Sequence, residues 1–348
     1  MLADLKMNGK TRKVLMQAPK EGFFYVLDRE TGQLISAKQY ADRVTWAKGI
    51  DMTTGRPIEN PDQRYEKDMA VVEPSAFGAH NWHPMSFSPK TGLVYIPAQN
   101  TGGAFQKEQD FKIKEGAWNL GVDLSLFKGL NRENAGAGHL LAWDPVRQKP
   151  AWRVQHRFLW NGGTLATAGN LVFQGRSDMH FAAYSADKGK KLWEVPVETG
   201  IIAGPMTYML EGVQYVSVSA GWGGAFALVA GDAALATGAR PGGAVLTYAL
   251  ATKLPPVPAP PVDPQLAKGE ALYHSYCAVC HGAGGISGGL IPDLRHSSEE
   301  VKKNMPIIIK NGISGTGMAP FAKWVSDDDA KLIEKYVRTR AKDESQGK

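Results

Sequence analysis

Short apolar runs separated by turn residues fill the first 250 positions of the chain. Five of these runs are rich in β-branched and aromatic residues, and most lie beside glycine, asparagine, aspartate or Lys-Thr-Gly turns. This pattern is typical of strands and predicts an all-β architecture. The expected strands are Phe23–Leu27, Leu93–Pro97, Leu140–Trp143, Leu171–Gln174 and Gln214–Val218.

A sequence repeat supports the same architecture. Residues 142–154 (AWDPVRQKPAWRV) align without gaps to residues 183–195 (AYSADKGKKLWEV), and residues 25–36 form a third, diverged copy. Each copy predicts a strand, a tight turn around glycine or glutamine, and a second strand. An interval of about 40 residues suits one blade of a β-propeller, with Trp152 and Trp193 packed between neighbouring blades. Two unrelated hairpins, each with a buried tryptophan, are the alternative.

The C-terminal tail has the apolar spacing of helices. A first helix is expected from Pro264 to Cys280, and Ser326 is a candidate N-cap for a last one. Three aspartates follow Ser326 and complement the positive end of a helix dipole. The last helix then presents an apolar stripe on one side, which predicts a core-facing helix. The stripe consists of Leu332, Ile333, Tyr336 and Val337.

The only two cysteines of the chain stand in one motif, Cys277-Ala278-Val279-Cys280-His281. This spacing is the attachment signature of a c-type haem, in which two thiols bind the porphyrin and the histidine binds the iron. A redox dithiol and half of a zinc site are the alternatives. Zinc would need two further ligands at matching spacing, and no other cysteine exists, so covalent haem c is the stronger interpretation.

The tail around this motif resembles a small cytochrome c domain. The resemblance implies that Gly269 and Tyr273 of the first helix cross Ile333 and Tyr336 of the last. It also places the sixth iron ligand shortly before the last helix. Three residues are candidates for that ligand: Met318, Met305 and His296. We expect Met318, in the glycine-rich segment GTGMAPF, to bind the iron, and we assign Met305, which precedes Pro306 at an expected helix start, to packing.

Composition excludes few classes of protein. The 348 residues leave room for two domains, and 43% hydrophobic and 21% charged residues are ordinary for a globular chain. The net charge of +6 arises from basic residues scattered among 34 acidic ones. Because no basic run with interleaved aromatics is present, nucleic-acid binding is not expected. No apolar run reaches the length of a transmembrane helix.

The first residues of the chain bear on the cell compartment in which the protein is found. Residues 1–6 do not read as a signal peptide, whereas attachment of haem c takes place outside the bacterial cytoplasm. We expect a periplasmic protein whose export signal lies elsewhere or upstream of Met1.

A proline-rich segment divides the chain into domains. Residues 251–265, ATKLPPVPAPPVDPQ, predict a semi-rigid spacer. The expected domains are therefore residues 1–250, a linker at 251–261, and a cytochrome c domain at 262–348.

A propeller followed by a proline linker and a cytochrome resembles the C-terminal part of a quinohaemoprotein alcohol dehydrogenase that depends on pyrroloquinoline quinone (PQQ). The resemblance is carried by residues 17–29 (QAPKEGFFYVLDR), 78–87 (GAHNWHPMSF) and 221–224 (GWGG). It implies about half of an eight-bladed all-β propeller followed by an all-α cytochrome c domain. It further implies oxidation of alcohols to aldehydes or ketones at PQQ, with electrons passing to the haem.

The resemblance also assigns residues to the quinone site. Lys20 matches the cation near the quinone carbonyls, although on residue type alone it would be a surface lysine. Asn81 and Trp82 match cofactor contacts from a propeller loop, where a turn asparagine beside a core tryptophan is the structural alternative. Trp222 and Gly223 match the segment that closes on the cofactor, and core packing explains them equally well. A metal pair formed by His80 and His83 is a minor alternative.

Parts of the family pattern are not found in these residues. The family's catalytic aspartate, vicinal disulfide, calcium ligands and floor tryptophan lie upstream of the segment that matches. We therefore expect this chain to be inactive alone, as a fragment, a truncated product or a split subunit completed by another chain. A non-enzymatic electron carrier with a propeller docking module is the alternative. The expected partners are an alcohol, the other propeller half, and an acceptor such as a cytochrome, copper protein or quinone pool.

Overall fold

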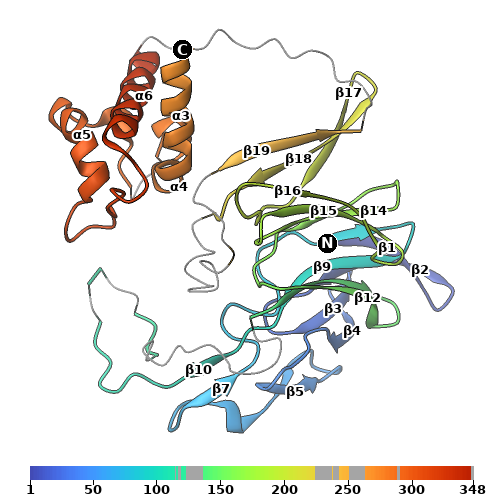
Figure 1. Ribbon diagram of the computed structural model, residues 1–348. Coiled ribbons are helices and arrows are strands. Elements are labelled where there is room, and N and C mark those ends of the chain that lie inside the picture. The colour runs from blue at the N-terminus through green and yellow to red at the C-terminus, as the bar shows by residue number, and fades with distance from the viewer. Residues whose placement is uncertain are drawn as a thin grey trace. The chain divides into compact units, whose positions relative to one another are not determined.

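The computed structural model describes residues 1–113, 115–116, 119–122, 136–223, 237, 243–250, 263–287 and 291–345. These residues fall into two compact units, one formed by the sheets of residues 1–206 and one that begins at Thr207 and contains the C-terminal helices (Figure 1). The expected linker at 251–261 lies outside the described residues, and the expected domain boundaries on either side of it stay predictions.

The first unit is built from antiparallel sheets of four strands. One has the order β1-β2-β3-β4, one β12-β11-β9-β8 and one β13-β14-β15-β16. Two short ribbons pair β5 with β6 and β7 with β10. The bounds are β1 Leu2–Met7, β2 Lys10–Gln17, β3 Phe23–Asp28, β4 Leu34–Gln39, β5 Ala47–Ile50, β6 Pro57–Glu59, β7 Ala70–Val72, β8 Ser86–Ser88, β9 Leu93–Gln99, β10 Gly103–Phe105, β11 Gly138–Asp144, β12 Lys149–His156, β13 Thr164–Ala166, β14 Leu171–Arg176, β15 His180–Ser185 and β16 Lys191–Pro196.

The three copies of the predicted repeat have the same local structure. Their hairpins β3–β4, β11–β12 and β15–β16 carry a register shift at equivalent places, between Val26/Leu27, Ala142/Trp143 and Ala183/Tyr184. The turn residue of each hairpin has a positive φ, at 75° for Gly32, 53° for Gln148 and 68° for Gly189. The three copies of the repeat therefore form blade hairpins with the same local geometry, and the alternative of unrelated hairpins is wrong.

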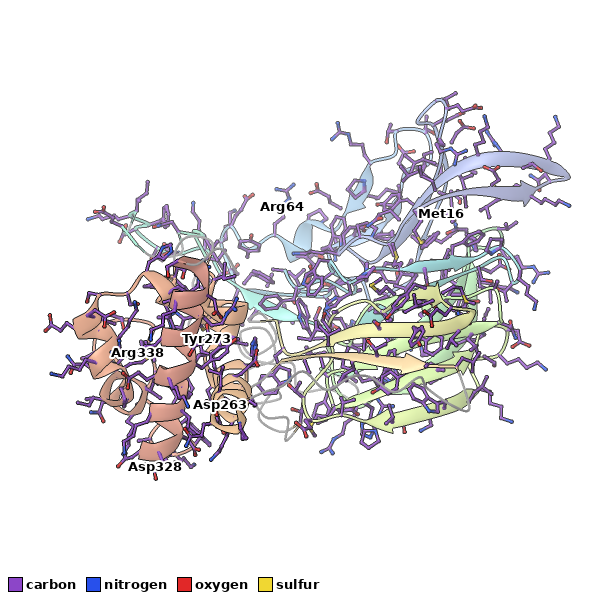
Figure 2. The ribbon with its side chains drawn as sticks, turned by 90° about the horizontal axis from the view of Figure 1, so that it is seen from above. Met16, Arg64, Asp263, Tyr273, Asp328 and Arg338 are labelled. Carbon is purple, nitrogen blue, oxygen red and sulfur yellow. The ribbon has the colours of Figure 1, made fainter. Side chains whose placement is uncertain are left out.

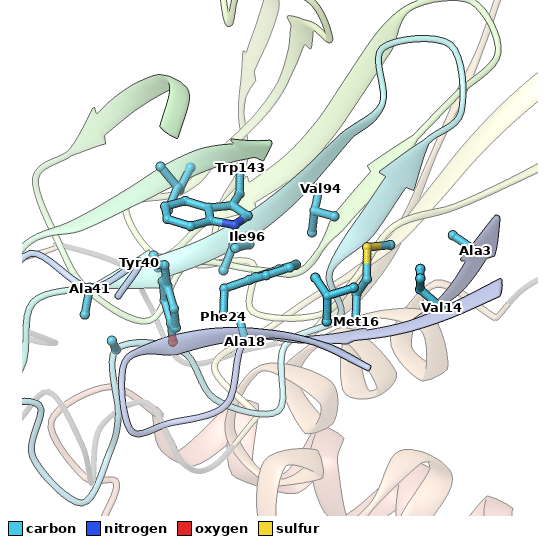
Figure 3. Close-up of a cluster of buried hydrophobic side chains, with 14 of the residues drawn as sticks. Ala3, Val14, Met16, Ala18, Phe24, Tyr40, Ala41, Val94, Ile96 and Trp143 are labelled. Atoms are coloured by element: carbon cyan, nitrogen blue, oxygen red, sulfur yellow. The ribbon is translucent and has the colours of Figure 1, made fainter. Parts of the chain in front are cut away.

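Buried side chains join consecutive sheets face to face. Phe24 of β3 and Trp143 of β11 meet with ring centroids 5.8 Å apart, inside a cluster that also contains Met16 and Ile96 (Figure 3). A second cluster, around Tyr95, joins the second sheet to the third. All members of these two clusters are apolar or aromatic, as packing between the faces of neighbouring sheets requires.

The two tryptophans expected between blades differ in their contacts. Trp152 of β12 donates its indole N–H to the carbonyl oxygen of Ala186 at 3.0 Å, and its ring lies against Gly189, so its position between neighbouring sheets is confirmed. Trp193 meets the ring of Phe181 edge-on within its own sheet. Its expected packing between blades stays a prediction.

The second unit contains a three-stranded sheet and the C-terminal helices. The sheet has the order β17-β18-β19, with bounds Met206–Leu210, Val213–Ala220 and Ala244–Ala249. All five strands predicted from the sequence are confirmed, within β3, β9, β11, β14 and β18. The helices are α3 Pro264–Tyr276, α4 Ala278–His281, α5 Glu299–Asn311 and α6 Asp327–Ser345. Within the described part of the chain, none of the helices combines the length and the apolar character that crossing a bilayer requires.

The helices pack around Tyr273, which is fully buried between α3 and α6 (Figure 2). Its ring centroid lies 5.2 Å from that of Tyr336, which confirms the predicted crossing of the first and last helices. Ser326 caps α6 as expected, because its hydroxyl oxygen accepts the Asp329 N–H at 3.1 Å.

Two expectations about the helices are wrong in detail. The helix predicted from Pro264 to Cys280 is interrupted at Cys277, which caps α3 and leaves a separate turn, α4, for the rest of the motif. Pro306 does not begin a helix, because α5 starts at Glu299 under a Ser298 cap and carries Pro306 inside it.

Candidate functional site

The two cysteines of the haem motif occupy different surroundings. Cys277 is buried in the helical core beside Tyr273, whereas Cys280 on α4 is exposed, and both are free. Burial, together with the nearby Cys280, raises the pKa of the Cys277 thiol to about 12. A thiol that stays protonated is a poor redox nucleophile and a poor zinc ligand. The raised pKa therefore counts against the dithiol and zinc alternatives, and covalent haem attachment at Cys277 and Cys280 stays a prediction.

The His281 ring is oriented by a backbone carbonyl. Its Nδ1 lies 3.0 Å from the carbonyl oxygen of Pro292. A ring that donates from Nδ1 keeps the lone pair of Nε2 for a metal, and such an outer hydrogen bond also makes the ligand more basic. Tyr273 holds the next residue in place by donating its hydroxyl to the Gly282 carbonyl oxygen at 2.9 Å. These contacts fit a histidine that binds haem iron.

The three candidates for the sixth iron ligand lie on different elements. Met305 of α5 is 5% exposed and belongs to the core cluster of the helices, which agrees with its assignment to packing. His296 is exposed at the end of the short helix η4 (Leu294–His296). Met318 is half-buried in the loop between α5 and α6, where its carbonyl oxygen accepts the Ile313 N–H at 3.0 Å. Its role as an iron ligand stays a prediction.

Apolar side chains suited to a porphyrin lie exposed near the motif and near the Met318 loop. Val279, Ile286 and Ile313 are 52%, 50% and 47% exposed. Burying aliphatic surface of this kind against a macrocycle would contribute about 25 cal/mol per Å². Together with the orientation of His281, these side chains fit a covalently held haem.

In the first unit, Lys20 lies against a loop far from it in sequence. Its carbonyl oxygen accepts the Ala79 N–H at 2.9 Å, and its exposed ammonium donates to the Ala76 carbonyl oxygen at 3.2 Å. A Cβ placed on Gly78 would stand 2.6 Å from the Lys20 Cβ, so only glycine permits this approach. The structure thus brings Lys20 together with the loop of Asn81, as the resemblance implied.

The Asn81 side chain is fixed by its own loop. Its Nδ2 donates to the Phe77 carbonyl oxygen at 2.9 Å, and its Oδ1 accepts the Trp82 N–H at 2.8 Å. Trp82 is 56% exposed, and its ring stacks on that of His83 at 4.3 Å. The alternative of a core tryptophan is therefore wrong for Trp82, whose indole is available to a planar ligand.

The two histidines beside Asn81 and Trp82 are buried and do not form a metal pair. Both ring nitrogens of His80 face backbone carbonyl oxygens, those of Ala18 at 2.6 Å and His83 at 2.7 Å. Burial lowers the pKa of His83 to about 3, so its ring is neutral. Throughout the described ranges, no cluster of three or more His, Cys, Asp or Glu side chains could hold a metal ion.

Gln99 was not singled out by the sequence. From the end of β9, its Nε2 donates to the Gly78 carbonyl oxygen at 3.1 Å, and its Oε1 accepts the Trp160 N–H at 3.0 Å. No local signal marks a strand-end glutamine for this role.

Trp222 and Gly223 follow β18 in the second unit, where Gly223 has a φ of 61°. Their part in a quinone site stays a prediction.

Comparisons with known proteins match both parts of the chain. Residues 104–216 match the model of the glucose/ethanol/alcohol dehydrogenase β-propeller domain, and residues 264–337 match that of cytochrome c oxidase, cbb3-type, subunit III. The quinohemoprotein alcohol dehydrogenase ADH IIB of Pseudomonas putida is 47% identical over 97% of this chain and 51% of its own length. The chain is a homologue of the quinohaemoprotein alcohol dehydrogenases. The predicted partial propeller followed by a cytochrome c domain is thereby confirmed.

Other quinohaemoprotein dehydrogenases give the same picture. The enzyme of Comamonas testosteroni is 42% identical over 98% of this chain and 50% of its own. The solved structure of ADHIIG from Pseudomonas putida HK5 superposes with a TM-score of 0.68 at 41% identity, covering 99% of this chain and 54% of that one. The chain therefore spans about half the length of the curated relatives it matches.

Proposed function

We propose that this chain forms the C-terminal half of a PQQ-dependent alcohol dehydrogenase and carries its electron exit, a covalent haem c. In the propeller segment, Lys20, Asn81 and Trp82 line the quinone site. The assignment of Trp222 and Gly223 to the cofactor rests on the resemblance alone. The observation that carries the proposal is the packing of Lys20 against the Asn81 loop. Ala79 of that loop donates its N–H to the Lys20 carbonyl oxygen at 2.9 Å, across more than fifty residues of sequence.

Each residue of the quinone site has a definite task in this proposal. When bound, PQQ would supply the two-electron oxidation of an alcohol, and haem c would supply the one-electron path out. The Lys20 ammonium uses one N–H on Ala76 and keeps two donors for negative charge developing on a ligand oxygen. The second Nδ2–H of Asn81 is likewise available to a carbonyl or carboxylate. The exposed face of Trp82 supports a flat ligand.

The haem domain uses its own residues to hold the iron and the porphyrin. Cys277 and Cys280 would form the thioethers, and His281 would bind the iron through Nε2 while Nδ1 donates to Pro292. Met318 would supply the sixth ligand, which raises the reduction potential relative to two histidines. Because this attachment takes place outside the bacterial cytoplasm, the proposed location is the periplasm. The proposed electron acceptor is a soluble redox protein or a membrane quinone.

We further propose that these 348 residues, as an isolated polypeptide, do not oxidise alcohols. The aspartate, vicinal disulfide and calcium ligands of the family do not map onto them. The chain's two cysteines are both in the haem motif, so none is left for a disulfide. Calcium therefore has no assigned ligands in this chain.

The test compares the isolated chain with a chimera. Both are expressed with cytochrome c maturation factors, one alone and one joined to the N-terminal half of Pseudomonas putida ADH IIB. With PQQ, calcium and ethanol or 1-butanol, the chimera is expected to reduce its haem, and the isolated chain is expected to show only dithionite-reducible haem. Lys20→Ala in the chimera should abolish reduction by alcohol. Alcohol-dependent reduction in the isolated chain would contradict the proposed incompleteness, and a chimera with no reduction and no PQQ affinity would favour a simple electron carrier.

A further inference from the structure

One buried imidazole lies between the two segments of the proposed quinone site. The His80 residue is 3% exposed. Its Nδ1 is 2.6 Å from the carbonyl oxygen of Ala18, two residues before Lys20. Its Nε2 is 2.7 Å from the carbonyl oxygen of His83, the residue after Trp82. The ring therefore spans from the backbone that leads to Lys20 to the backbone that leaves Trp82.

On the far side of this bridge, His83 packs against the exposed side chain of Trp82. The His83 ring stacks on Trp82 with centroids 4.3 Å apart and an interplanar angle of 21°. Its other side meets Trp160 edge-on at 4.9 Å. Because His80 holds the backbone of His83, it also fixes the position from which the Trp82 indole is supported.

Other contacts between the two segments leave this role to His80. The Ala79 N–H bond to Lys20 joins the beginning of the loop to the Lys20 segment, and Gln99 holds Gly78 from outside. The end of the loop, where Trp82 and His83 lie, is joined to the Lys20 segment through the His80 ring. Beyond the loop, the Pro84 carbonyl oxygen accepts the Thr164 N–H at 2.8 Å, so losing this ring would loosen the stretch between Ala79 and Pro84, which contains Trp82, while leaving both of these contacts in place.

We propose that His80 is a positioning residue of the quinone site, whose buried ring lies between the carbonyl oxygens of Ala18 and His83, donates its one N–H to one of them, and so sets the distance between Lys20 and the Asn81–Trp82 pair. The identity of the ligand in this inference rests on the proposed function. The contacts of the His80 ring do not depend on that function. A quinone ring held between Lys20 and Trp82 needs these two residues at a fixed distance from each other. The rigid imidazole ring of His80 supplies that distance.

Amide variants can break the bridge one side at a time. An asparagine side chain places its nitrogen near the position of a histidine Nδ1, and a glutamine places its nitrogen near Nε2. His80→Asn should therefore offer a donor to Ala18 alone, and His80→Gln a donor to His83 alone. His80→Leu offers a donor to neither. His156→Leu is the matched control, because His156 is an equally buried histidine of the first unit that bonds to Gln174 instead.

Two measurements decide the proposal, amide hydrogen exchange on the full chain and PQQ affinity on the chimera. Amide exchange in residues 80–83 should accelerate at least tenfold in His80→Leu and in the amide variant whose donor faces the carbonyl oxygen that His80 does not use, and it should stay near the wild-type rate in the other amide variant. The dissociation constant of PQQ, from tryptophan quenching, should rise about tenfold in His80→Leu, as loss of a buried hydrogen bond predicts. His156→Leu should change neither.

The outcomes separate this inference from the proposed function. Unchanged exchange in all three His80 variants, or exchange that ignores which side of the bridge was kept, would overturn the positioning role. A wild-type chimera that binds no PQQ would count against the proposed quinone site, while the side-specific exchange pattern would still decide the role of His80. If His80→Leu does not fold, the asparagine and glutamine variants alone carry the test.

Discussion

Gly269 and Leu332 touch backbone to backbone where α3 crosses α6. A Cβ built on Gly269 would lie 2.3 Å from the Leu332 carbonyl oxygen and 3.3 Å from the Tyr336 Cβ. A methyl group at this position must push the two helices apart, because the nearest atom belongs to a rigid backbone. The closeness of this crossing sets how Tyr273 and Tyr336 meet in the core of the helical domain.

Gly269→Ala is therefore expected to destabilise the haem domain. Overpacking of this kind costs about 1–3 kcal/mol, and the helix propensity gained from alanine offsets only part of it. The free energy of unfolding in urea, followed by far-UV ellipticity and haem absorbance, measures the effect. Gly317→Ala is the control, since no atom lies within 4 Å of a Cβ there and its φ is not left-handed. Equal stability of the two variants would contradict the close crossing.

The turn glycines of the repeat allow a matched comparison. Gly32 and Gly189 have nearly the same φ, 75° and 68°, so an alanine at either position meets the same backbone strain. Only at Gly189 would the new Cβ also lie 2.5 Å from the Trp152 ring, whereas nothing lies within 4 Å at Gly32. We expect Gly189→Ala to cost about 1–2 kcal/mol more than Gly32→Ala in urea unfolding followed by tryptophan fluorescence. A difference near zero would mean that Trp152 moves freely between the sheets.

These turns show what could be predicted from the sequence. The repeat gave the blade hairpins, the position of their turns and the packing of Trp152, because each depends on residues within one hairpin or at one fixed spacing. The Cys277 motif and the Ser326 cap were equally local. The interruption of the first helix at Cys277 was not predicted, because it follows from tertiary packing rather than from helix propensity.

The support of the quinone site could not be predicted from the sequence. His80 bonds to Ala18 across 62 residues, and Gln99 bonds to Trp160 across 61. Local periodicity contains no information about such pairs, which exist only once two blades have packed. The resemblance identified Lys20, Asn81 and Trp82 but not the side chains that hold them in place.

Met318→Ala tests the sixth iron ligand. Loss of the thioether is expected to remove its charge-transfer absorption from the oxidised spectrum and to lower the reduction potential, since thioether coordination favours the ferrous state. Met305→Leu should leave the absorption and the reduction potential unchanged, because Met305 packs in the core formed by the C-terminal helices. His296→Gln should also leave both unchanged. A variant at Met318 with a wild-type spectrum and potential would eliminate it as the ligand.

Buried histidines predict a loss of stability in acid. Burial lowers the pKa of His83 and His139 to about 3 and that of His156 to about 4, against about 6.5 in an unfolded chain. The unfolded state therefore binds more protons below pH 6.5, and the folded state is progressively disfavoured from there down to about pH 4 by His156 and to about pH 3 by His83 and His139. Each of the three residues should contribute about 2 kcal/mol of lost stability between pH 7 and pH 5.

Urea unfolding of the propeller segment at these two pH values, followed by tryptophan fluorescence, measures the loss. His156→Gln is the informative variant, because glutamine can still donate to Gln174 as the His156 Nε2 does at 2.9 Å, but it does not titrate. The difference in stability between pH 7 and pH 5 should shrink by about 2 kcal/mol, the contribution of His156, in this variant. A segment equally stable at both pH values would mean that these rings become protonated inside the fold, and an unchanged difference in His156→Gln would remove His156 from the explanation.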